Sequence, residues 1–243
     1  MADVDKINLI IPAAGVGTRL GKYTKSKSKN MVFIDKKTIF EHQIKSFNFK
    51  FINKLIFITG YKKDYLKKYV NKLRLPIKIY YLFNRRFKMT QCANSLVIAL
   101  KKFKDNAIIL NSDLIFDKTS INYVLKNKNK NFLFIRNKKN NFKSRPVKIL
   151  YKNKKIINIG IGIENFNYDV VGPIIFQKEA IIEILKKIKK KKRKYLDNIS
   201  CYEIINLIKD KFKFNCKIIK DKKWHEINTI NDLQIFKKKQ RVN

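Results

Sequence analysis

The stretch Leu9-Ile-Ile-Pro-Ala-Ala-Gly-Val-Gly-Thr-Arg-Leu20 constrains the fold of this 243-residue chain more than any other feature. Apolar residues run into small residues and two glycines, and a Thr-Arg pair follows at once. This order predicts a buried strand that ends in a tight loop, whose backbone N–H groups are free to hold an anion. The expected ligand is rich in phosphate, because basic residues follow at Arg19, Lys22, Lys25, Lys27 and Lys29.

The charge of the chain is strongly positive, with 57 Lys and Arg against 18 Asp and Glu, a formal net charge of +39. Such a balance ordinarily suggests nucleic acid or an anionic membrane as a partner. Lysine dominates over arginine, however, and Lys, Asn and Ile are frequent together, as the codons of an AT-rich genome would produce. The lysines also spread along the whole chain, apart from residues 186–194. We therefore expect a solvated basic surface and no specific nucleic-acid partner.

Length and composition fit one domain, residues 1–243, with a full hydrophobic core. No apolar run approaches the roughly 20 residues that span a bilayer, and the first residues lack the basic region of a signal peptide. We expect a cytoplasmic protein without a membrane span. The three cysteines are far apart and lack zinc-ligand spacing, so we expect reduced thiols at Cys92, Cys201 and Cys216.

The hydrophobic pattern predicts strands and helices in alternation through the first half of the chain. We expect strands at residues 6–13, 54–59, 76–83 and 107–110, and helices at residues 39–49, 62–73 and 93–103. This order indicates a mostly parallel sheet with crossover helices.

The pattern changes after a helix that begins at residues 120–125. Several short strands within residues 131–176 predict an antiparallel extension of the sheet, and the family resemblance described below implies that it lies on the acceptor side of the site. Residues 178–189 and 198–211 have the pattern of helices, residues 214–219 that of a last strand, and a closing helix follows Trp224.

A Gly-x-Gly after a strand is a weak signal by itself, because it occurs in dinucleotide-binding folds and in ordinary turns. The dinucleotide motif needs a third glycine and an acidic residue after the second strand, and this chain has Ile58-Thr-Gly-Tyr61 there. A Walker-type loop is absent as well. Both of these nucleotide-binding motifs are therefore disfavoured.

The motif resembles the signature of nucleotidyltransferases that activate sugar phosphates or phosphocholine, Ala-Ala-Gly-x-Gly-Thr-Arg-Leu followed by Thr-x-x-x-Pro-Lys. Here it reads Ala13-Ala-Gly-Val-Gly-Thr-Arg-Leu20 and then Thr24-Lys-Ser-Lys-Ser-Lys29, with Ser28 in place of proline. The resemblance implies that Arg19 and Lys29 are catalytic and stabilise phosphates. It also implies nucleotide contacts from Ala13, Ala14, Gly15, Gly17 and Thr18.

Two later segments resemble the phosphocholine cytidylyltransferase-like branch of this family. Asn84-Arg-Arg-Phe-Lys-Met-Thr-Gln-Cys-Ala-Asn-Ser-Leu96 is similar to its Asn-x-x-Tyr…Thr-Asn-Asn-x-x-Ser-Leu, and implies nucleotide contacts from Thr90 and Ser95. A loop and helix cap explains the same residues equally well. Trp224-His-Glu-Ile-Asn-Thr-Ile-Asn-Asp-Leu233 is similar to Trp-x-Glu-Ile-Asp-Thr-x-x-Asp-Leu.

The resemblance implies a Mg²⁺ cofactor, because nucleotidyl transfer needs a divalent cation against the charge of the transition state. Asp113, after the fourth strand, matches the family's metal-binding aspartate. Asn228 occupies the place of the second aspartate and Glu226 lies near it, so the implied metal set is Asp113, Glu226 and Asn228. For the acceptor, Asp169 is a candidate for an amine or hydroxyl, and Tyr168 and Trp224 are candidates for cation–π contact. Ordinary packing is the alternative for all three.

The expected fold is a three-layer α/β, mostly parallel nucleotide-binding sheet of the glycosyltransferase-A-like kind that this family has. The resemblance implies transfer of a nucleotidyl group from an NTP, CTP in particular, to a small phosphorylated acceptor such as phosphocholine, with release of pyrophosphate and an association with cell-surface polysaccharide biosynthesis. A hexose 1-phosphate with UTP, dTTP or GTP is the alternative. A non-catalytic nucleotide sensor or RNA-associated basic protein is an alternative of another class, and a homodimer is possible.

Overall fold

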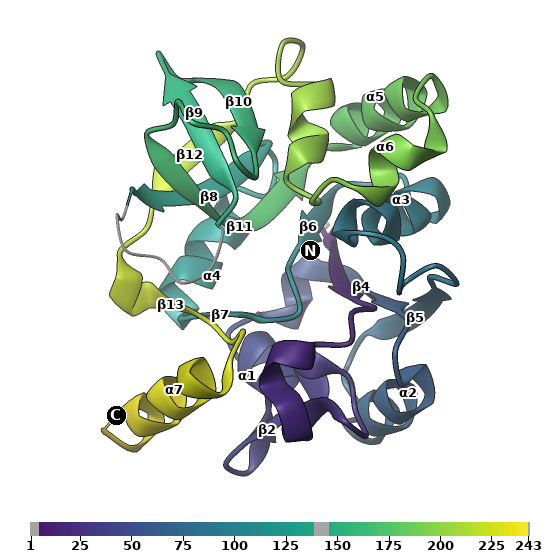
Figure 1. Ribbon diagram of the computed structural model, residues 1–243, viewed down its shortest axis with the longest axis vertical. Coiled ribbons are helices and arrows are strands. Elements are labelled where there is room, and N and C mark those ends of the chain that lie inside the picture. The colour runs from purple at the N-terminus through teal and green to yellow at the C-terminus, as the bar shows by residue number, and fades with distance from the viewer. Residues whose placement is uncertain (1–4, 139–145, 243) are drawn as a thin grey trace.

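The computed structural model describes residues 5–138 and 146–242 (Figure 1). Its centre is a nine-stranded sheet in the order β10-β9-β11-β6-β1-β4-β5, with β8 paired to β11 and β12 paired to β8. The bounds are β1 Ile7–Ala13, β4 Ile52–Thr59, β5 Lys78–Phe83, β6 Ala107–Ile109, β8 Phe132–Asn137, β9 Lys148–Lys152, β10 Lys155–Gly160, β11 Tyr168–Phe176 and β12 Asn215–Ile218.

The strands from β6 to β5 form the parallel part of this sheet. β1 pairs with β4 on one side and with β6 on the other, and β4 pairs with β5, all in parallel. All seven residues of β1 are buried, as expected for a central parallel strand covered on both faces. The carboxyl ends of these strands therefore lie at one edge, where ligands of such sheets bind.

An antiparallel part begins at β11, which pairs with β6, β8 and β9 in that sense. β10 and β9 extend this part as a hairpin, whereas β12, the last strand of the nine-stranded sheet in chain order, is parallel to β8. Figure 1 shows this part above the parallel strands, beside the helices α5 and α6. The predicted fold class, a mostly parallel α/β sheet with an antiparallel extension, is confirmed.

Helices cover both faces of the sheet and give it three layers. α3 (Cys92–Lys102) and α5 (Lys178–Lys189) contribute to one hydrophobic cluster. α1 (Ile39–Ile44), α2 (Lys63–Lys72) and α4 (Lys118–Lys126) contribute to the other. Successive side chains of β1 alternate between the clusters, with Ile10 in the first and Leu9 and Ile11 in the second.

Two predicted helices are wrong in extent because polar side chains bond to the backbone within them. The helix predicted for residues 39–49 is shorter in the structure, because α1 ends at Ile44. The Asn48 side chain then accepts a hydrogen bond from the Lys50 N–H at the start of a 3₁₀ turn, Phe49–Phe51. Within the range 198–211, predicted as one helix, the structure has only a 3₁₀ helix, Glu203–Leu207, and a short helix, α6 (Arg193–Asp197), lies before that range. There Ser200 N–H donates to the Glu203 carboxylate at 2.7 Å. Such local bonds compete with a continuous helix.

The chain's last elements return to the sheet edge. β13 (Trp224–Glu226) pairs antiparallel with β7 (Leu114–Phe116), and α7 (Ile230–Val242) follows. A short hairpin of β2 (Phe33–Ile34) and β3 (Lys37–Thr38) precedes α1.

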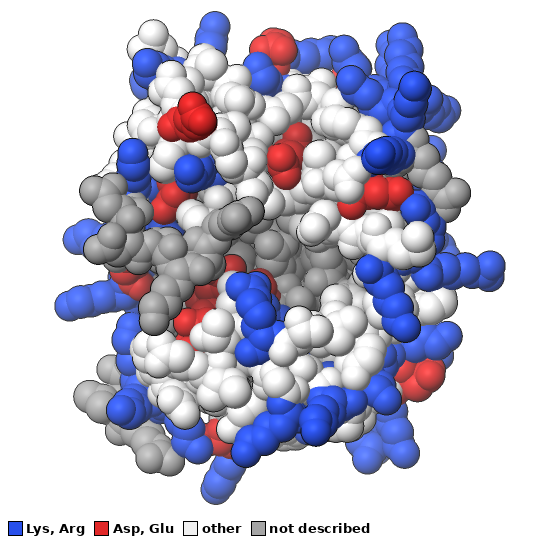
Figure 2. All heavy atoms as spheres, in the orientation of Figure 1, with Lys and Arg blue, Asp and Glu red and all other residues white. Residues whose placement is uncertain are grey.

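The surface in Figure 2 carries Lys and Arg around its whole outline, with no single basic stripe, and it is hollowed near its middle. Within the described ranges, no helix is long and apolar enough to cross a membrane.

Candidate active site

The loop after β1 packs directly against the turn after β4. Tyr61 N–H donates to the Ala14 carbonyl at 3.0 Å. A Cβ built on Gly60 would lie 2.5 Å from that carbonyl oxygen and 2.7 Å from Phe87 Cβ. Only glycine permits this approach, so Gly60 fixes the distance between the loop after β1 and the loop that carries Phe87.

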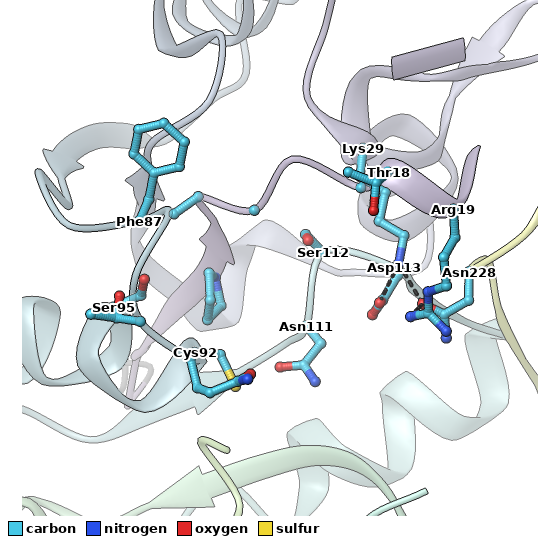
Figure 3. Close-up of a pocket in the computed structure, with 16 residues that line it drawn as sticks. Thr18, Arg19, Lys29, Phe87, Cys92, Ser95, Asn111, Ser112, Asp113 and Asn228 are labelled. Carbon is cyan, nitrogen blue, oxygen red and sulfur yellow. Dashed lines mark hydrogen bonds and ion pairs between the residues drawn. The ribbon is translucent and has the colours of Figure 1, made fainter. Parts of the chain in front are cut away.

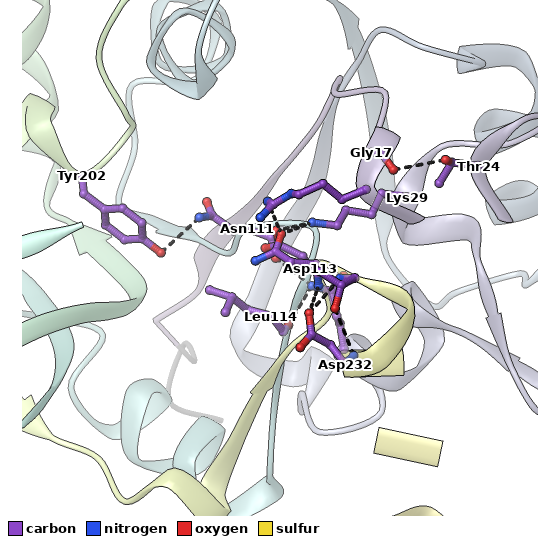
Figure 4. Close-up of polar contacts among 12 residues, drawn as sticks. Gly17, Thr24, Lys29, Asn111, Asp113, Leu114, Tyr202 and Asp232 are labelled. Carbon is purple, nitrogen blue, oxygen red and sulfur yellow. Dashed lines mark hydrogen bonds and ion pairs between the residues drawn. The ribbon is translucent and has the colours of Figure 1, made fainter. Parts of the chain in front are cut away.

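The two glycines of the loop after β1 have different roles. Gly17 has φ of +71°, and a Cβ there would lie 3.0 Å from Lys29 Cβ. Its carbonyl accepts the Thr24 hydroxyl at 3.1 Å, which ties the loop to the residues before Lys29 (Figure 4). Gly15 has nothing within 4 Å of the position of a Cβ, so open space lies beside it.

Lys29 begins a 3₁₀ turn, Lys29–Met31, in a rigid setting. Ser28, which stands in the family's proline position, has φ of −67°, a value that proline would also have. The Ser28 side chain is buried and its hydroxyl lies 2.9 Å from Asn30 Oδ1. The backbone at Ser28 thus has a φ that is compatible with the proline of the motif.

Asp113 lies in the turn between β6 and β7, and this turn is held from two sides. The Gln43 amide of α1 donates to the carbonyls of Asn111 and Leu114, both at 2.8 Å. On the other side, Ile227 N–H donates to the Asp113 carbonyl at 2.9 Å, next to the β7–β13 pairing. That pairing brings residues 226–228 beside Asp113, although they follow Asp113 by more than a hundred positions in the sequence.

Four side chains converge at this point, as Figure 3 shows. Lys29 Nζ lies 2.7 Å from Asp113 Oδ2 and donates to Asn228 Oδ1 at 2.6 Å. Arg19 Nη2 donates to the same Asn228 oxygen at 2.7 Å. Arg19 and Lys29, which are predicted to bind phosphate, are therefore held beside the turn of residues 110–113, which we call the acidic turn, by the Asn228 amide and the Asp113 carboxylate.

The electrostatics of this cluster favour a cation. Asp113 Oδ1 is buried without a hydrogen-bond partner. Burial raises the pKa of Glu226, and the neighbouring Asp113 raises it further. A buried, unpartnered carboxylate oxygen beside a desolvated acid is a suitable place for a hard divalent ion. The described residues contain no group of three or more His, Cys, Asp or Glu that could form a complete metal cage. A Mg²⁺ ion fits such a site because it keeps waters and takes phosphate oxygens as ligands.

Asp232 has the structural role of a helix cap. Its carboxylate accepts the N–H groups of Asn228 and Thr229 at 3.0 and 2.7 Å, and Thr229 Oγ1 accepts the Asp232 N–H in return. This pair fixes the backbone of Asn228 at the start of α7, where a negative charge is favourable.

Two adjoining cavities meet at the cluster. The first cavity, about 390 Å³, is lined by Pro12, Ala14, Gly15, Gly17, Thr18, Arg19, Lys29, Phe87, Thr90, Gln91, Cys92, Ser95, Asn111, Ser112, Asp113 and Asn228. The second cavity, about 500 Å³, shares six of these residues, Arg19, Gln91, Cys92, Asn111, Asp113 and Asn228. Arg136, Val147, Tyr202, Trp224 and Glu226 are among those that complete it.

The predicted nucleotide residues are placed together, with one exception. The structure brings Ala14, Gly15, Gly17, Thr18, Thr90 and Ser95 into the lining of the first cavity. Ala13 is buried at the end of β1 and does not line it.

The predicted acceptor residues are dispersed. Trp224 lines the second cavity, but Asp169 and Tyr168 do not. Asp169 is buried, and Arg136 Nε donates to its Oδ2 at 3.2 Å across neighbouring strands. Its carboxylate is thus already paired with a cation of the protein, which disfavours the predicted contact with an acceptor amine.

Sequence reasoning missed two residues of the second cavity, Arg136 and Tyr202. The Arg136 guanidinium lies 5.2 Å from the centroid of the Trp224 ring, within cation–π range. Its signal in the sequence is a charge at the end of the apolar strand β8. Tyr202 OH accepts the Asn111 amide at 3.1 Å, and nothing in the sequence pattern indicates this contact.

A family model described as nucleotidyl transferase matches residues 8–144, more than half of the chain. The chain belongs to the nucleotidyl transferase family. No curated protein sequence matches it. Many solved structures share its fold, among them CTP:phosphocholine cytidylyltransferase from Streptococcus pneumoniae, with a TM-score of 0.76 and 20% identity over 97% of this chain and 99% of that one.

Members with other substrates in their names are equally similar. A glucose-1-phosphate thymidylyltransferase from Bacillus anthracis, described as putative, has a TM-score of 0.78 and 20% identity over 97% of this chain and 95% of that one. The inositol-1-phosphate CTP transferase from T. maritima has a TM-score of 0.75 and 17% identity over 93% and 91%. At these identities the likeness shows the fold that the nucleotidyltransferases share.

Proposed function

We propose that the protein transfers a nucleotidyl group from an NTP, CTP in first place, to a small phosphorylated acceptor such as phosphocholine, and releases pyrophosphate. The observation that carries this proposal is the meeting of Arg19, Lys29 and Asp113 where the two cavities join. A triphosphate in the first cavity and a phosphorylated acceptor in the second would bring their reacting groups to this point.

The reaction is a single in-line displacement. An oxygen of the acceptor's phosphate attacks the α-phosphorus, a new P–O bond forms, and the bond to the β-phosphate oxygen breaks with the electron pair leaving on pyrophosphate. The attacking phosphate is already a nucleophile, so the step needs no general base. Burial lowers the pKa of His225 to about 4, which leaves that ring neutral at pH 7.

Arg19 and Lys29 stabilise the charge that develops on the phosphoryl oxygens. In the structure their donors are directed at Asn228 and Asp113, so the phosphates replace these partners when the triphosphate binds. Charge-assisted hydrogen bonds that are directed at developing charge are the strongest contribution such a site can make. Asp113, with Glu226 and Asn228 beside it, would hold a Mg²⁺ ion, which supplies positive charge against the phosphates when bound.

CTP and phosphocholine are supported by the resemblance of residues 84–96 and 224–233 to the phosphocholine branch. A hexose 1-phosphate with UTP, dTTP or GTP is the second candidate, and one contact favours it. Because Arg136 covers the Trp224 ring, the second cavity presents a guanidinium where a quaternary ammonium would need an aromatic face. Hydroxyl oxygens of a sugar would accept hydrogen bonds from that guanidinium.

The test is pyrophosphate release by the purified protein with Mg²⁺, each of CTP, UTP, dTTP and GTP, and a panel of acceptors. The panel contains phosphocholine, phosphoethanolamine, phosphoglycerol and hexose 1-phosphates. Asp113→Ala should abolish turnover. Asp117→Ala is the matched control, because Asp117 caps α4 and pairs with Lys223 outside both cavities, so its loss should leave turnover intact. Absence of release with every pair would refute the proposal.

A further inference from the structure

Residues 197–202, which we call the clasp segment, run from the last residue of α6 to the 3₁₀ helix Glu203–Leu207 and reach the second cavity. Ser200 and Tyr202 line the second cavity. Asp197 lines neither cavity, yet it makes the strongest contacts of the segment, and these contacts are directed at the loop of residues 84–91.

Asp197 contacts this loop at two residues, Arg86 and Gln91, and it also contacts Asn94 at the start of α3. Arg86 donates to both carboxylate oxygens, from Nη1 at 2.9 Å and from Nη2 at 2.7 Å, in bidentate geometry. The Asn94 amide donates to Oδ1 at 3.1 Å, and the Asp197 carbonyl accepts the Gln91 N–H at 2.9 Å. The ion pair is largely shielded from water, since the side chains of Arg86 and Asp197 are 28% and 13% exposed.

The loop that is held in this way forms one wall of the first cavity. Phe87, Thr90 and Gln91 line the cavity, and Figure 3 shows Phe87 on the side away from Thr18 and Arg19. Within the loop, the buried Asn84 amide donates to Thr90 and Ser95 at 3.1 and 3.0 Å. These internal bonds keep the shape of the loop, whereas its position relative to the rest of the site depends on contacts such as those of Asp197.

The other end of the clasp segment contacts the acidic turn. Cys201 N–H donates to Cys92 Sγ at 2.9 Å, and Cys201 Sγ lies 3.4 Å from Asn111 Oδ1. Asn111 also donates to Tyr202 OH, as Figure 4 shows, and lies two residues before Asp113. One short segment thus contacts both the loop of residues 84–91 and the turn that carries Asp113.

We propose that Asp197 is a positioning residue that sets the width of the first cavity, by holding the loop of residues 84–91 through Arg86 while Asn94 of α3 fixes the same carboxylate. The identity of the ligand, an NTP, rests on the proposed function. A bidentate Arg–carboxylate pair fixes direction as well as distance, and an error of about 1 Å in a binding wall is costly. Asp197 acts through the loop and does not itself touch the nucleotide.

The test compares Asp197→Asn with Glu183→Gln. Both changes replace one carboxylate of an ion pair with an isosteric amide, and Glu183, 2.9 Å from Lys211, lies outside the lining of both cavities. Five quantities are measured: the melting temperature, the hydrogen exchange of amides 85–91 without nucleotide, the dissociation constant of CTP by calorimetry, kcat, and the KM of the acceptor.

For Asp197→Asn we expect exchange of amides 85–91 to rise about tenfold and CTP to bind about tenfold more weakly, with kcat and the acceptor KM within about twofold of wild type. Arg86→Ala should reproduce these effects, and the double variant should be no worse than either change alone. Glu183→Gln should lower the melting temperature without either effect.

Unchanged exchange of amides 85–91 in Asp197→Asn would overturn the proposal, as would the same changes in Glu183→Gln. The exchange measurement needs no substrate. A wild-type protein without turnover on any substrate pair would therefore refute the proposed function alone, and the exchange of the loop would still decide the role of Asp197.

Discussion

Replacing Asn228 by Asp tests how the cluster is balanced. Asn228 Oδ1 accepts from Lys29 at 2.6 Å and from Arg19 at 2.7 Å, while two carboxylates, Asp113 and Glu226, lie beside the same site. The amide therefore leaves the cluster with two cations and two acids. Asn228→Asp adds a third carboxyl group without a change of shape, and we expect it to tighten Mg²⁺ binding and to preserve or raise turnover.

The magnitude follows from the surroundings. In the metal-free protein, two hydrogen bonds gain about 1 kcal/mol each on becoming ion pairs. Repulsion by Asp113 and Glu226 offsets this gain, so we expect stability to change by less than about 1 kcal/mol. A divalent ion about 4 Å from one added charge gains about 8 kcal/mol at an effective dielectric constant of 20. Desolvation removes most of this, and a remainder of about 1.4 kcal/mol is a tenfold lower Mg²⁺ requirement.

The assay is pyrophosphate release as a function of Mg²⁺ concentration, at saturating NTP and acceptor. Asn106→Asp is the matched control, because Asn106 Oδ1 accepts the Lys178 N–H at the start of α5, outside both cavities. It adds the same charge and should leave the Mg²⁺ requirement unchanged. An unchanged or higher requirement in Asn228→Asp, or a fall in turnover, would show that the site has been built around the amide and would refute this reasoning.

Three further changes give distinct outcomes. Lys29→Met should lower turnover by about 10²–10³-fold, because a hydrogen-bond donor to phosphate is lost. Mg²⁺ should raise the melting temperature of this variant more than that of wild type, because no ammonium competes for Asp113; an equal Mg²⁺ effect on both proteins would contradict this. Gly15→Ala should raise the NTP KM about tenfold without loss of stability. Gly60→Ala, whose Cβ would meet a carbonyl oxygen at 2.5 Å, should lower the unfolding free energy by about 3 kcal/mol; equal effects of the two changes in calorimetry would contradict the different roles of these glycines. Burial lowers the pKa of His225 to about 4, so the unfolded chain takes up a proton first as pH falls below about 6.5, and folding stability is lost between about pH 6.5 and 4. In denaturant titrations at pH 4.5, His225→Phe should retain about 2 kcal/mol of the unfolding free energy that wild type loses; parallel pH profiles of the two proteins would refute this.

The parallel part of the fold could be predicted because its signals are local. Apolar runs ending in glycine or polar residues define β1 and β4, and helical spacing defines α2 and α3. The interruption of the helix predicted for residues 198–211 could not be predicted from the sequence. It depends on the hydrogen bond that the Ser200 N–H donates to the Glu203 carboxylate in the folded chain.

The site divides in the same way. The meeting of Arg19, Lys29 and Asp113 could be predicted, because Arg19 and Lys29 belong to one motif after β1 and Asp113 follows the neighbouring parallel strand β6. The ion pair between Asp169 and Arg136 was not, since it depends on the register of β8 against β11, which the sequence pattern does not specify. For the same reason the contacts of Asp197 with Arg86, 111 positions away, become visible only in the folded molecule.

The bond from Arg19 to Asn228 joins residues 209 positions apart. Closing a flexible loop of that length costs roughly 5 kcal/mol of chain entropy, which the pairing of β13 with β7 helps to offset. A nascent chain can assemble β1, β4, β5 and β6 well before Asn228 has been synthesised. Until then, Lys29 has Asp113 but not Asn228 as a partner, and Arg19 lacks the Asn228 oxygen to which it donates. The order of synthesis thus delays completion of the catalytic centre until almost the whole sheet has folded.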